Sequence, residues 1–229
     1  MKRLAIIPAR GGSKRIPQKN IKNFCGKPMI SYVIETAKST NLFDTIHVST
    51  DCNRVAEVVE LLSLTIDFMR PANLADDLTP IMPVLKFVVN EYKSQGIIYD
   101  EVWLLMACSP LLKKIDLIKA SNIYQNSVKT KSLLGVAEYP VPIEWAFKID
   151  DKQNLKPINP GAFLNRSQDI EKKYFDTGTF GIFSSETILN SDQGSDKEFI
   201  GYVLPKFSSI DIDTDEDWAH AEKIFTSDG

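Results

Sequence analysis

Short apolar runs alternate with amphipathic stretches along most of the chain, and this alternation restricts the possible folds more than any other feature. We expect buried strands at five apolar runs, residues 3–9, 45–50, 64–70, 100–107 and 132–140. Apolar residues recur at helical spacing between these runs, at 26–40, 53–63, 81–96 and 109–127. Such an order predicts an α/β protein with an open, mainly parallel sheet and helices on both faces.

The second half of the chain continues this pattern after an interruption. From about 139 to 176 the sequence contains four prolines and several turn signals. We expect a small β-rich excursion there, over the mouth of the active site, rather than a separate folding unit. Strand character returns at 177–185, 199–205 and 208–213, and a closing helix is predicted at 214–225 with Thr214 as its cap. The sequence therefore predicts one domain over 1–229.

Composition argues against several classes of protein. Hydrophobic residues make up 43% of the 229 residues, which is enough for a substantial core, and no apolar run is long enough to span a membrane. The three cysteines and two histidines lack the spacing of a disulfide framework or a zinc site, and we expect His47 and His220 to be structural. These features favour a cytoplasmic protein without a membrane partner.

Positive charge is concentrated at the start of the chain, although the net charge is −3. Eight basic residues and no acidic residue lie before Glu35. A nucleic-acid-binding protein usually carries basic residues over a whole face, whereas this cluster occupies one segment. The pattern favours a small polyanion such as a nucleoside triphosphate over nucleic acid, and a solvated lysine-rich surface is the alternative.

The basic segment joins the first predicted strand to the first predicted helix, at the carboxyl edge of the sheet, where ligands of such folds bind. Gly11 and Gly12 allow a sharp turn that brings backbone amides close to a ligand, and Ser13 adds a hydroxyl group. The loop matches neither the glycine pattern of dinucleotide-binding enzymes nor that of P-loop ATPases. Those two classes are therefore disfavoured.

Several segments of the chain resemble one family of enzymes. The string PARGGSKRIPQKN, followed by GKPMISYVIETA and VSTD, resembles the acylneuraminate cytidylyltransferases, which activate nonulosonic acids with CTP. Later segments of that family are matched, in order, by MRPANLADD, SPLL and SSIDIDTDEDWAHAE. The resemblance covers nearly the whole chain. It implies a Rossmann-like fold of the nucleotide-diphospho-sugar transferase type and a homodimer whose subunit contact lies in the excursion.

Two segments indicate the branch of the family. Sialic acid enzymes usually carry Gln-Pro-Thr-Ser-Pro after the middle strand, and here the stretch is MACSP, with Met106 in place of the glutamine. The segment RSQDIEKKYFDTGTF is similar to that of pseudaminate cytidylyltransferases, although Phe175 and Thr179 stand where that branch is expected to carry His and Gln. The resemblance favours pseudaminate, with another nonulosonic acid as the alternative.

The resemblance also implies the residues that bind the nucleotide. Lys19, expected on a solvated loop, and Arg10 are predicted to be catalytic, because cations there would stabilise charge on the departing pyrophosphate. The full set of nucleotide-binding positions is Ala9, Arg10, Gly11, Gly12, Ser13, Lys14, Lys19, Asn20, Arg70 and Thr79. Arg70 has an ordinary ion pair as its alternative role. The loop 75–79 would form a wall of the cytosine site, and Asp51 either lines the same cleft or caps the next helix.

The sugar and metal sites are predicted from two further segments. Arg166, Gln168 and Asp169 are the sugar-binding candidates, with hydrogen bonding within a turn as the alternative. Asp211 and Asp213 alternate with two isoleucines, so a strand there would place both carboxylates on one face. Adjacent carboxylates repel each other unless a cation lies between them, and hard oxygen ligands suit Mg²⁺. The family assigns this Asp-x-Asp to the metal, and a solvated acidic strand edge is the alternative.

The predicted reaction is the condensation of CTP with a nonulosonic acid, most simply pseudaminic acid, to give a CMP-sugar and pyrophosphate. The anomeric hydroxyl of the sugar would attack the α-phosphate, with Mg²⁺ as cofactor. Asp211, the more critical of the two acids, is the third predicted catalytic residue, and it would help a metal-bound water take the hydroxyl proton. N-acetylneuraminate, legionaminate and 3-deoxy-manno-octulosonate are alternative substrates. A non-catalytic nucleotide-binding module is a more distant alternative.

Overall fold

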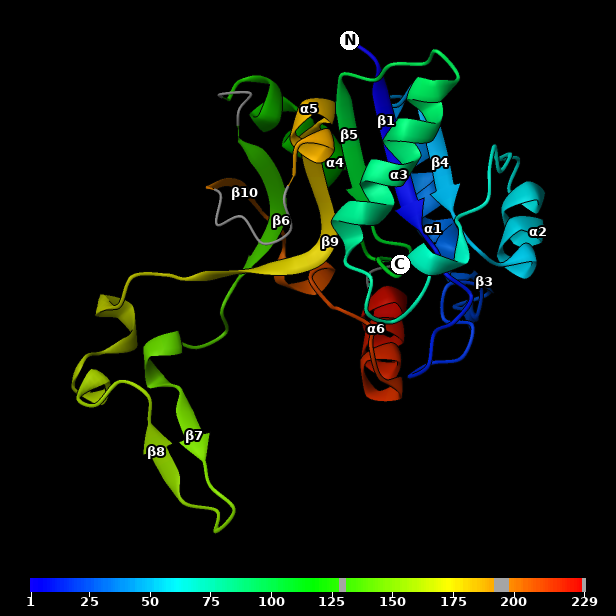
Figure 1. The fold of residues 1–229 in the computed structure, drawn as a ribbon. Helices are drawn as coiled ribbons and strands as arrows, with labels where there is room; N and C mark the ends of the chain where they lie inside the picture. The colour runs from blue at the N-terminus through cyan, green and yellow to red at the C-terminus, as the bar shows by residue number, and fades with distance from the viewer. Residues whose placement is uncertain (128–130, 192–197, 228–229) are drawn as a thin grey trace.

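The computed structural model describes residues 1–127, 131–191 and 198–227. Within them, a central six-stranded sheet has the order β10-β6-β9-β5-β1-β4 (Figure 1). Its strands are β1 (Arg3–Pro8), β4 (Thr45–Ser49), β5 (Glu101–Leu105), β6 (Ser132–Glu138), β9 (Tyr174–Ser184) and β10 (Phe199–Val203). β1 is parallel to β4 and β5, and β10 is parallel to β6, whereas β9 is antiparallel to both of its neighbours. The predicted open, mainly parallel sheet is therefore confirmed.

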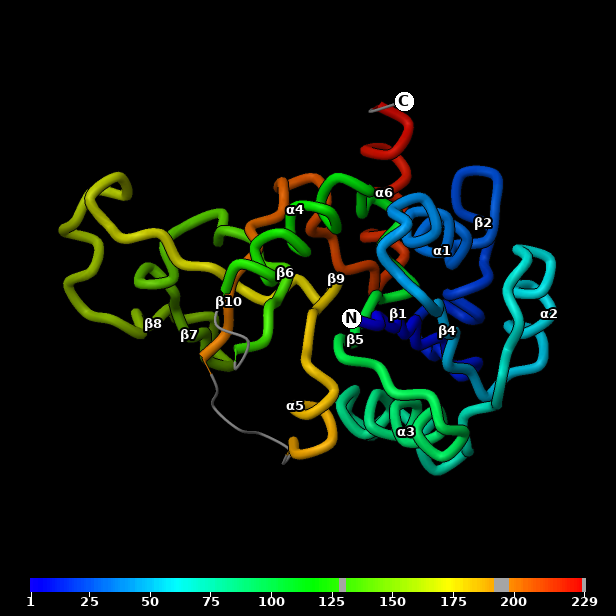
Figure 2. Tube along the Cα trace, turned by 90° about the horizontal axis from the view of Figure 1, so that it is seen from above, coloured from blue at the N-terminus to red at the C-terminus, as the bar shows by residue number. Residues whose placement is uncertain are grey.

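Helices cover both faces of this sheet, as predicted. The described residues form the helices α1 (Met29–Thr40), α2 (Asn53–Leu61), α3 (Ile81–Ser94), α4 (Lys114–Gln125), α5 (Ser185–Leu189) and α6 (Asp215–Ser227). Seen from above, α1 and α4 lie on one side of the sheet and α3 and α5 on the other (Figure 2). No helix in the described part of the chain combines the length and the hydropathy that a bilayer crossing requires.

The apolar run of β1 builds the two main cores. Ala5 and Ile7 pack into the cluster that contains residues of α1 and α4, and Leu4 and Ile6 pack into the cluster that contains residues of α3. All four side chains are fully buried. A central parallel strand is covered on both faces, so its sequence is continuously apolar rather than alternating.

The two strands predicted at 64–70 and 208–213 are not formed. Both segments keep the alternating exposure of a strand: Phe68 is half-buried beside exposed neighbours, and Ile212 is buried beside the more exposed Asp211. The first segment makes one backbone bond to the chain just after β4, from the Arg70 amide to the Thr50 carbonyl, at 2.7 Å. The second begins at the last residue of a short 3₁₀ turn, η5 (Lys206–Ser208). Alternation arises wherever an extended chain covers a core, whether or not a ladder of hydrogen bonds forms.

The closing helix α6 packs on the start of the chain and not on the main sheet. Its partner is a small hairpin of β2 (Asn23–Phe24) and β3 (Lys27–Pro28). The Phe24 ring centroid lies 5.4 Å from that of Trp218 and 5.6 Å from that of Phe225. This third core cluster, which also contains Ile16 and Ile212, joins the segment that follows β1 to the C-terminal segment of the chain (Figure 1). Thr214 caps α6 as predicted, accepting a bond from the Asp217 amide at 3.2 Å.

The excursion, defined here as residues 139–173, leaves the sheet after β6 and returns at β9. It contains the hairpin β7 (Phe147–Ile149) and β8 (Leu155–Pro157), and the 3₁₀ turns η2 (Ile143–Trp145), η3 (Ala162–Leu164) and η4 (Ser167–Asp169). Figure 1 shows it extending away from the body of the molecule. None of its residues is buried.

Candidate active site

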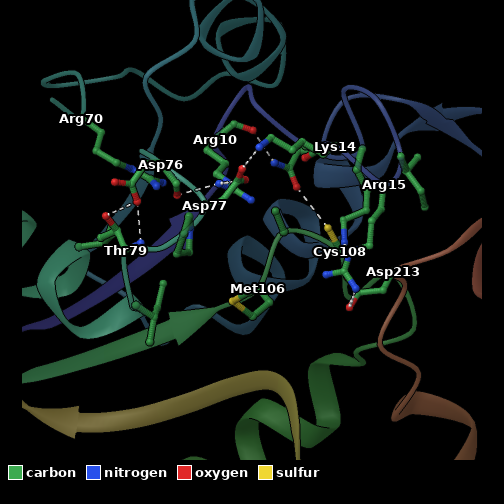
Figure 3. Close-up of a pocket in the computed structure, with 18 of the residues that line it drawn as sticks. Arg10, Lys14, Arg15, Arg70, Asp76, Asp77, Thr79, Met106, Cys108 and Asp213 are labelled. Atoms are coloured by element: carbon green, nitrogen blue, oxygen red, sulfur yellow. Dashed lines mark hydrogen bonds and ion pairs between the residues drawn. The ribbon is translucent and has the colours of Figure 1, made fainter. Parts of the chain in front are cut away.

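A cavity of about 310 Å³ opens at the carboxyl ends of β1 and β5. β1 has β4 on one side and β5 on the other, so the chain order reverses at this point of the sheet. Ligands of open α/β sheets bind at such switch points, because the loops after the strands diverge there. The basic loop, defined here as residues 9–20, forms one wall, and loops after α2 and β5 form the others (Figure 3).

The basic loop is held close to the end of β4. The Gly11 amide donates a hydrogen bond to Asp51 Oδ1 at 3.0 Å. A Cβ atom on Gly11 would lie 2.7 Å from the Cβ of Cys52, so this approach requires glycine. No side chain caps α2 at Cys52. Asp51 therefore fastens the basic loop rather than capping the helix that follows it.

Most of the predicted nucleotide-binding residues meet at the cavity. Those that line it are Arg10, Ser13, Lys14, Lys19, Asn20, Arg70 and Thr79. Ala9, Gly11 and Gly12 do not line it. Ala9 is fully buried, and its amide donates to the Ser49 carbonyl at 2.9 Å, so it anchors the loop to β4. The sequence analysis predicted which segment forms the cavity. It did not distinguish the residues that line the cavity from those that hold the loop in place.

The cations of the cavity are paired with carboxylates that the sequence did not single out. Arg10 Nη1 lies 2.7 Å from Asp77 Oδ1, and Lys14 Nζ pairs with the other oxygen of Asp77 (Figure 3). These bonds, first from Lys14 and then from Arg10, lower the pKa of Asp77 below its usual value, against a smaller opposing effect of burial. The adjacent acids of LADD lie far from the basic loop in the sequence, so no local pattern signalled this pairing.

Asp76 has a different role from its neighbour. Its Oδ1 accepts bonds from the amides of Leu78 and Thr79, at 2.9 and 2.6 Å, and from the Thr79 hydroxyl at 2.7 Å. These bonds lower the pKa of Asp76. Asp76 therefore fixes the turn in the predicted cytosine-binding loop, and that turn brings Thr79 to the cavity.

The basic loop also contacts the C-terminal segment, which carries Asp211 and Asp213. Lys19 Nζ donates to the Ile212 carbonyl at 2.5 Å and to Asp213 Oδ1 at 3.1 Å. Arg15 Nη1 lies 2.7 Å from Asp213 Oδ2. The expected solvated position of Lys19 is wrong, because its side chain is only 17% exposed and joins the two ends of the chain. Partial burial and the nearby Asp213 carboxylate raise the pKa of Asp211.

Two buried polar side chains complete the cavity wall. Arg70 is 6% exposed, and its Nε donates to Ser49 Oγ at 3.1 Å. It forms no ion pair within the described residues, and burial lowers its pKa. Asn20 donates to the Arg10 carbonyl at 3.0 Å and accepts from the Cys108 thiol at 3.2 Å, which fixes the orientation of its amide. Burial raises the pKa of Cys108 to about 11, so this thiol acts as a hydrogen-bond donor.

The sugar-binding candidates are not brought to this cavity within one chain. Arg166, Gln168 and Asp169 are exposed at η4 in the excursion, and none of them lines the cavity. Gln168 lines a separate hollow of about 230 Å³ at the base of the excursion. The excursion therefore does not lie over the mouth of its own chain's cavity, which differs from the expected position.

Metal-binding groups are sparse in the described part of the chain. No group of three or more His, Cys, Asp or Glu side chains is placed to hold an ion there. Asp213 lines the cavity, whereas Asp211 lies beside it and makes no hydrogen bond or ion pair with a described residue. The pair offers hard oxygen donors and leaves most of an ion's coordination to other ligands.

Comparison with known proteins agrees with this geometry. The chain matches a family model described as "Cytidylyltransferase" over residues 4–194. It is 37% identical over 227 residues to a pseudaminic acid cytidylyltransferase of Campylobacter jejuni, covering 98% of this chain and 97% of that one. It is 31% identical over 231 residues to the CMP-N,N'-diacetyllegionaminic acid synthase of Legionella pneumophila, covering 98% and 96%.

A solved structure shows the same fold. The structure of CMP:2-keto-3-deoxy-manno-octonic acid synthetase complexed with CTP superposes with a TM-score of 0.75 at 16% identity, over 100% of both chains. This likeness supports the Rossmann-like nucleotidyltransferase architecture that was predicted. Because the family model and the relatives span most of the chain, this protein belongs to the cytidylyltransferase family.

Proposed function

We propose that this enzyme condenses CTP with a nonulosonic acid, and that the acid is pseudaminic acid. The observation that carries the proposal is the convergence of Arg10, Lys14 and Lys19 on one cavity at the switch point of the sheet. A triphosphate is the anion whose charge and length suit such a loop. The name of the Campylobacter jejuni relative supports pseudaminic acid as the sugar.

In the proposed reaction, the anomeric oxygen of the sugar forms a bond to the α-phosphorus of CTP. The bond from that phosphorus to the bridging oxygen breaks, pyrophosphate leaves, and the hydroxyl proton is released. Arg10 and Lys19 stabilise the negative charge that develops on the leaving group. Lys19 is held by the Ile212 carbonyl before substrate arrives, so its ammonium group is already positioned. No side chain has to form a covalent intermediate.

We also propose Mg²⁺ as the cofactor, held by Asp211 and Asp213. The two carboxylates fit such an ion, because burial and then the nearby Asp213 carboxylate raise the pKa of Asp211, and a cation would offset both effects. Mg²⁺ commonly takes one or two protein carboxylates and completes its shell with water and substrate phosphates. When bound, the ion would neutralise phosphate charge. Asp213 would then give up its bonds to Lys19 and Arg15 in favour of the ion. Those two cations would be free to bind the phosphates.

We propose that the sugar site is completed by a second copy of the chain. The excursion exposes large apolar side chains that its own chain leaves uncovered, including Ile149 at 59% and Leu164 at 89% exposure. Their burial in a homodimer would place Arg166, Gln168 and Asp169 near a partner's cavity, where Arg166 can pair with the sugar carboxylate. We further propose a cytoplasmic location, which suits the three unpaired cysteines.

The test is pyrophosphate release from CTP with a panel of acids. We expect the highest kcat/KM with pseudaminic acid and lower values with legionaminate, N-acetylneuraminate and 3-deoxy-manno-octulosonate. Faster turnover of any of the last three would contradict the choice of sugar and leave the reaction class intact. Normal CTP binding without pyrophosphate release from any acid would instead identify a nucleotide-binding module.

A further inference from the structure

One carboxylate, that of Asp77, holds two of the four cations that the basic loop brings to the cavity. Its Oδ1 lies 2.7 Å from Arg10 Nη1, and its Oδ2 pairs with Lys14 Nζ (Figure 3). Each carboxylate oxygen thus takes the position on its cation that a phosphate oxygen of a bound nucleotide would need. The Asp77 side chain is 35% exposed, so the contact lies at the open side of the cavity and not in the core.

We propose that Asp77 is a specificity-determining residue that competes with phosphate for Arg10 and Lys14. It lowers the affinity of the basic loop for every anion that has to displace it. A tightly held nucleoside triphosphate stays bound at its working concentration, whereas inorganic phosphate and other weak anions do not. The same competition speeds the departure of pyrophosphate. The inference rests on the proposed role of the basic loop in triphosphate binding.

The Asp77 side chain can leave both cations without unfolding of its loop, and Arg10 Nη1 keeps a second bond to that loop, to the Asp76 carbonyl at 2.7 Å. Its turn is fixed by Asp76, which accepts the amides of Leu78 and Thr79 and the Thr79 hydroxyl. None of these bonds involves the Asp77 side chain. Displacement of Asp77 therefore breaks two ion pairs and leaves the turn in place.

The two ion pairs of Asp77 are weak enough for a bound triphosphate to replace them. Lys14 is 81% exposed and Arg10 is 32% exposed, so water screens both pairs and each contributes little net stability. A ligand that brings several oxyanions, as a triphosphate does, replaces both pairs and gains further charge-assisted bonds. A small anion exchanges one oxyanion contact for another and gains little.

The experiment measures binding in the absence of metal for the Asp77→Asn variant, which keeps the size of the side chain and removes its charge. By calorimetry at low salt, we expect pyrophosphate and CTP to bind about three- to tenfold more tightly than to the wild-type protein, because two partly exposed pairs are lost. Inorganic phosphate should become a measurable competitive inhibitor, and cytidine should bind unchanged. Unaltered or weaker pyrophosphate binding would overturn the inference.

The neighbouring acid supplies the matched control. Asp76→Asn removes an equal charge from the same loop and leaves the Asp77 pairs intact, so it should weaken CTP binding and should not tighten pyrophosphate binding. An equal tightening in both variants would overturn the inference, because the effect would then be one of general charge. Thermal denaturation checks the fold, and Asp77→Ala repeats the measurement should the Asn variant be unstable.

A third variant separates this inference from the proposed function. Lys14→Met should weaken pyrophosphate binding if the basic loop holds the triphosphate. No change in Lys14→Met would contradict the proposed role of the loop, and the inference with it. Weaker binding in Lys14→Met, together with unchanged binding in Asp77→Asn, would remove the role of Asp77 alone.

Discussion

The cavity and the excursion are built in opposite ways. At the cavity, side chains from the start, middle and end of the chain are fixed by bonds that cross the molecule, such as that from Lys19 to the Ile212 carbonyl. In the excursion, no residue is buried, and its rings stack on one another near the surface, as Phe147 does on Phe163 at 5.1 Å. A two-stranded hairpin is marginally stable on its own in water. The cavity is therefore held together by contacts within a single chain, whereas the excursion would gain buried surface in the proposed dimer.

In the proposed reaction, the two substrates would depend on different parts of the structure, one within a single chain and one in the assembly. The groups assigned to CTP lie within one chain and are preorganised there. The groups assigned to the sugar lie on the excursion and would meet a cavity only in an assembly. Substitutions in the cavity should therefore affect turnover in any oligomeric state, whereas substitutions in the excursion should act through assembly.

The largest effect is expected for Asp211→Asn. The variant keeps the size of the side chain but removes one of two charges proposed to hold Mg²⁺, so kcat should fall about 10³-fold and its dependence on Mg²⁺ should weaken. The measurement is pyrophosphate release over a range of Mg²⁺ concentrations. Asp215→Asn is the control, because that acid is 84% exposed in the first turn of α6 and should leave the titration unchanged. Unaltered titrations in both Asp211→Asn and Asp213→Asn would contradict the metal assignment.

Lys19→Met should follow, with a loss of about 10²-fold in kcat. Methionine retains much of the apolar stem but cannot donate to Ile212 or Asp213, so both the charge at the phosphates and the link between the chain ends are lost. Steady-state kinetics measure the first effect, and denaturant unfolding measures the second. Wild-type kcat in a folded variant would remove Lys19 from the reaction.

The sequence predicted the sheet, its helices and most of the cavity, because these depend on local patterns. β1 is apolar throughout, and Gly11 stands where only glycine fits. The segment around Phe68 was misjudged as a strand because alternating exposure does not reveal whether a neighbouring backbone is free to pair. The ion pairs of Asp77 were missed because they depend on how a loop folds back over a distant one, and no periodicity records that.

The position of the excursion could not be predicted for a different reason. Its prolines and turn signals marked a break in the pattern correctly, but they carry no information on the direction in which the excursion leaves the body. Arg166 was accordingly assigned to the sugar from resemblance, and the structure of one chain leaves it outside the cavity. An apolar residue in a sequence pattern indicates a buried side chain, but it does not tell whether the side chain is buried by its own chain or by a second copy.

Leu164→Asp should break the proposed dimer. The side chain is 89% exposed on η3, and a charge there would be buried unpaired in an apolar interface, so the dimer Kd should rise at least about 100-fold. Sedimentation measures the oligomeric state, and kinetics should show a raised KM for the sugar with nearly unchanged CTP binding. Leu61→Asp is the control, because this leucine is 85% exposed at the end of α2, on the opposite side of the molecule (Figure 1). A wild-type protein that sediments as a monomer would contradict the proposed assembly.

A smaller effect is expected for Phe225→Ala in α6. The ring contacts Phe24 and Tyr32, with centroids 5.6 and 5.0 Å away, but is only partly buried, so the free energy of unfolding should fall by about 2 kcal/mol. Because the same cluster contains Ile212, loosening it should also raise the Mg²⁺ concentration needed for half-maximal activity. Lys223→Ala, an exposed change on the same helix, should alter neither quantity. A loss of stability with an unchanged Mg²⁺ requirement would show that α6 does not position the acids.

The smallest effect concerns His47, a buried residue of the body of the molecule, and the loss of stability in mild acid. This ring is 1% exposed and stacks on Phe68 at 4.4 Å, and its Nδ1 lies 3.2 Å from the Tyr92 hydroxyl. Burial lowers its pKa from 6.5 to about 4, with a smaller opposing effect from Asp67. Between pH 6.5 and 4 the unfolded chain therefore binds a proton that the native state does not, so stability falls as the pH falls through this window.

The loss that His47 causes between pH 7 and pH 5 should be on the order of 1 kcal/mol. Denaturant unfolding in a Leu164→Asp background measures it without a contribution from subunit dissociation, since linkage to a dimer would otherwise make the result depend on concentration. His47→Gln should flatten the dependence on pH, whereas His220→Gln, a change at an exposed position of α6, should leave it intact. An unchanged slope in His47→Gln would assign the acid sensitivity to carboxylates instead. A slope that remains in His47→Gln would come from carboxylates whose pKa the folded chain lowers, among them Asp150, which accepts bonds from Asn154, and Glu171, which pairs with Lys173, both in the excursion.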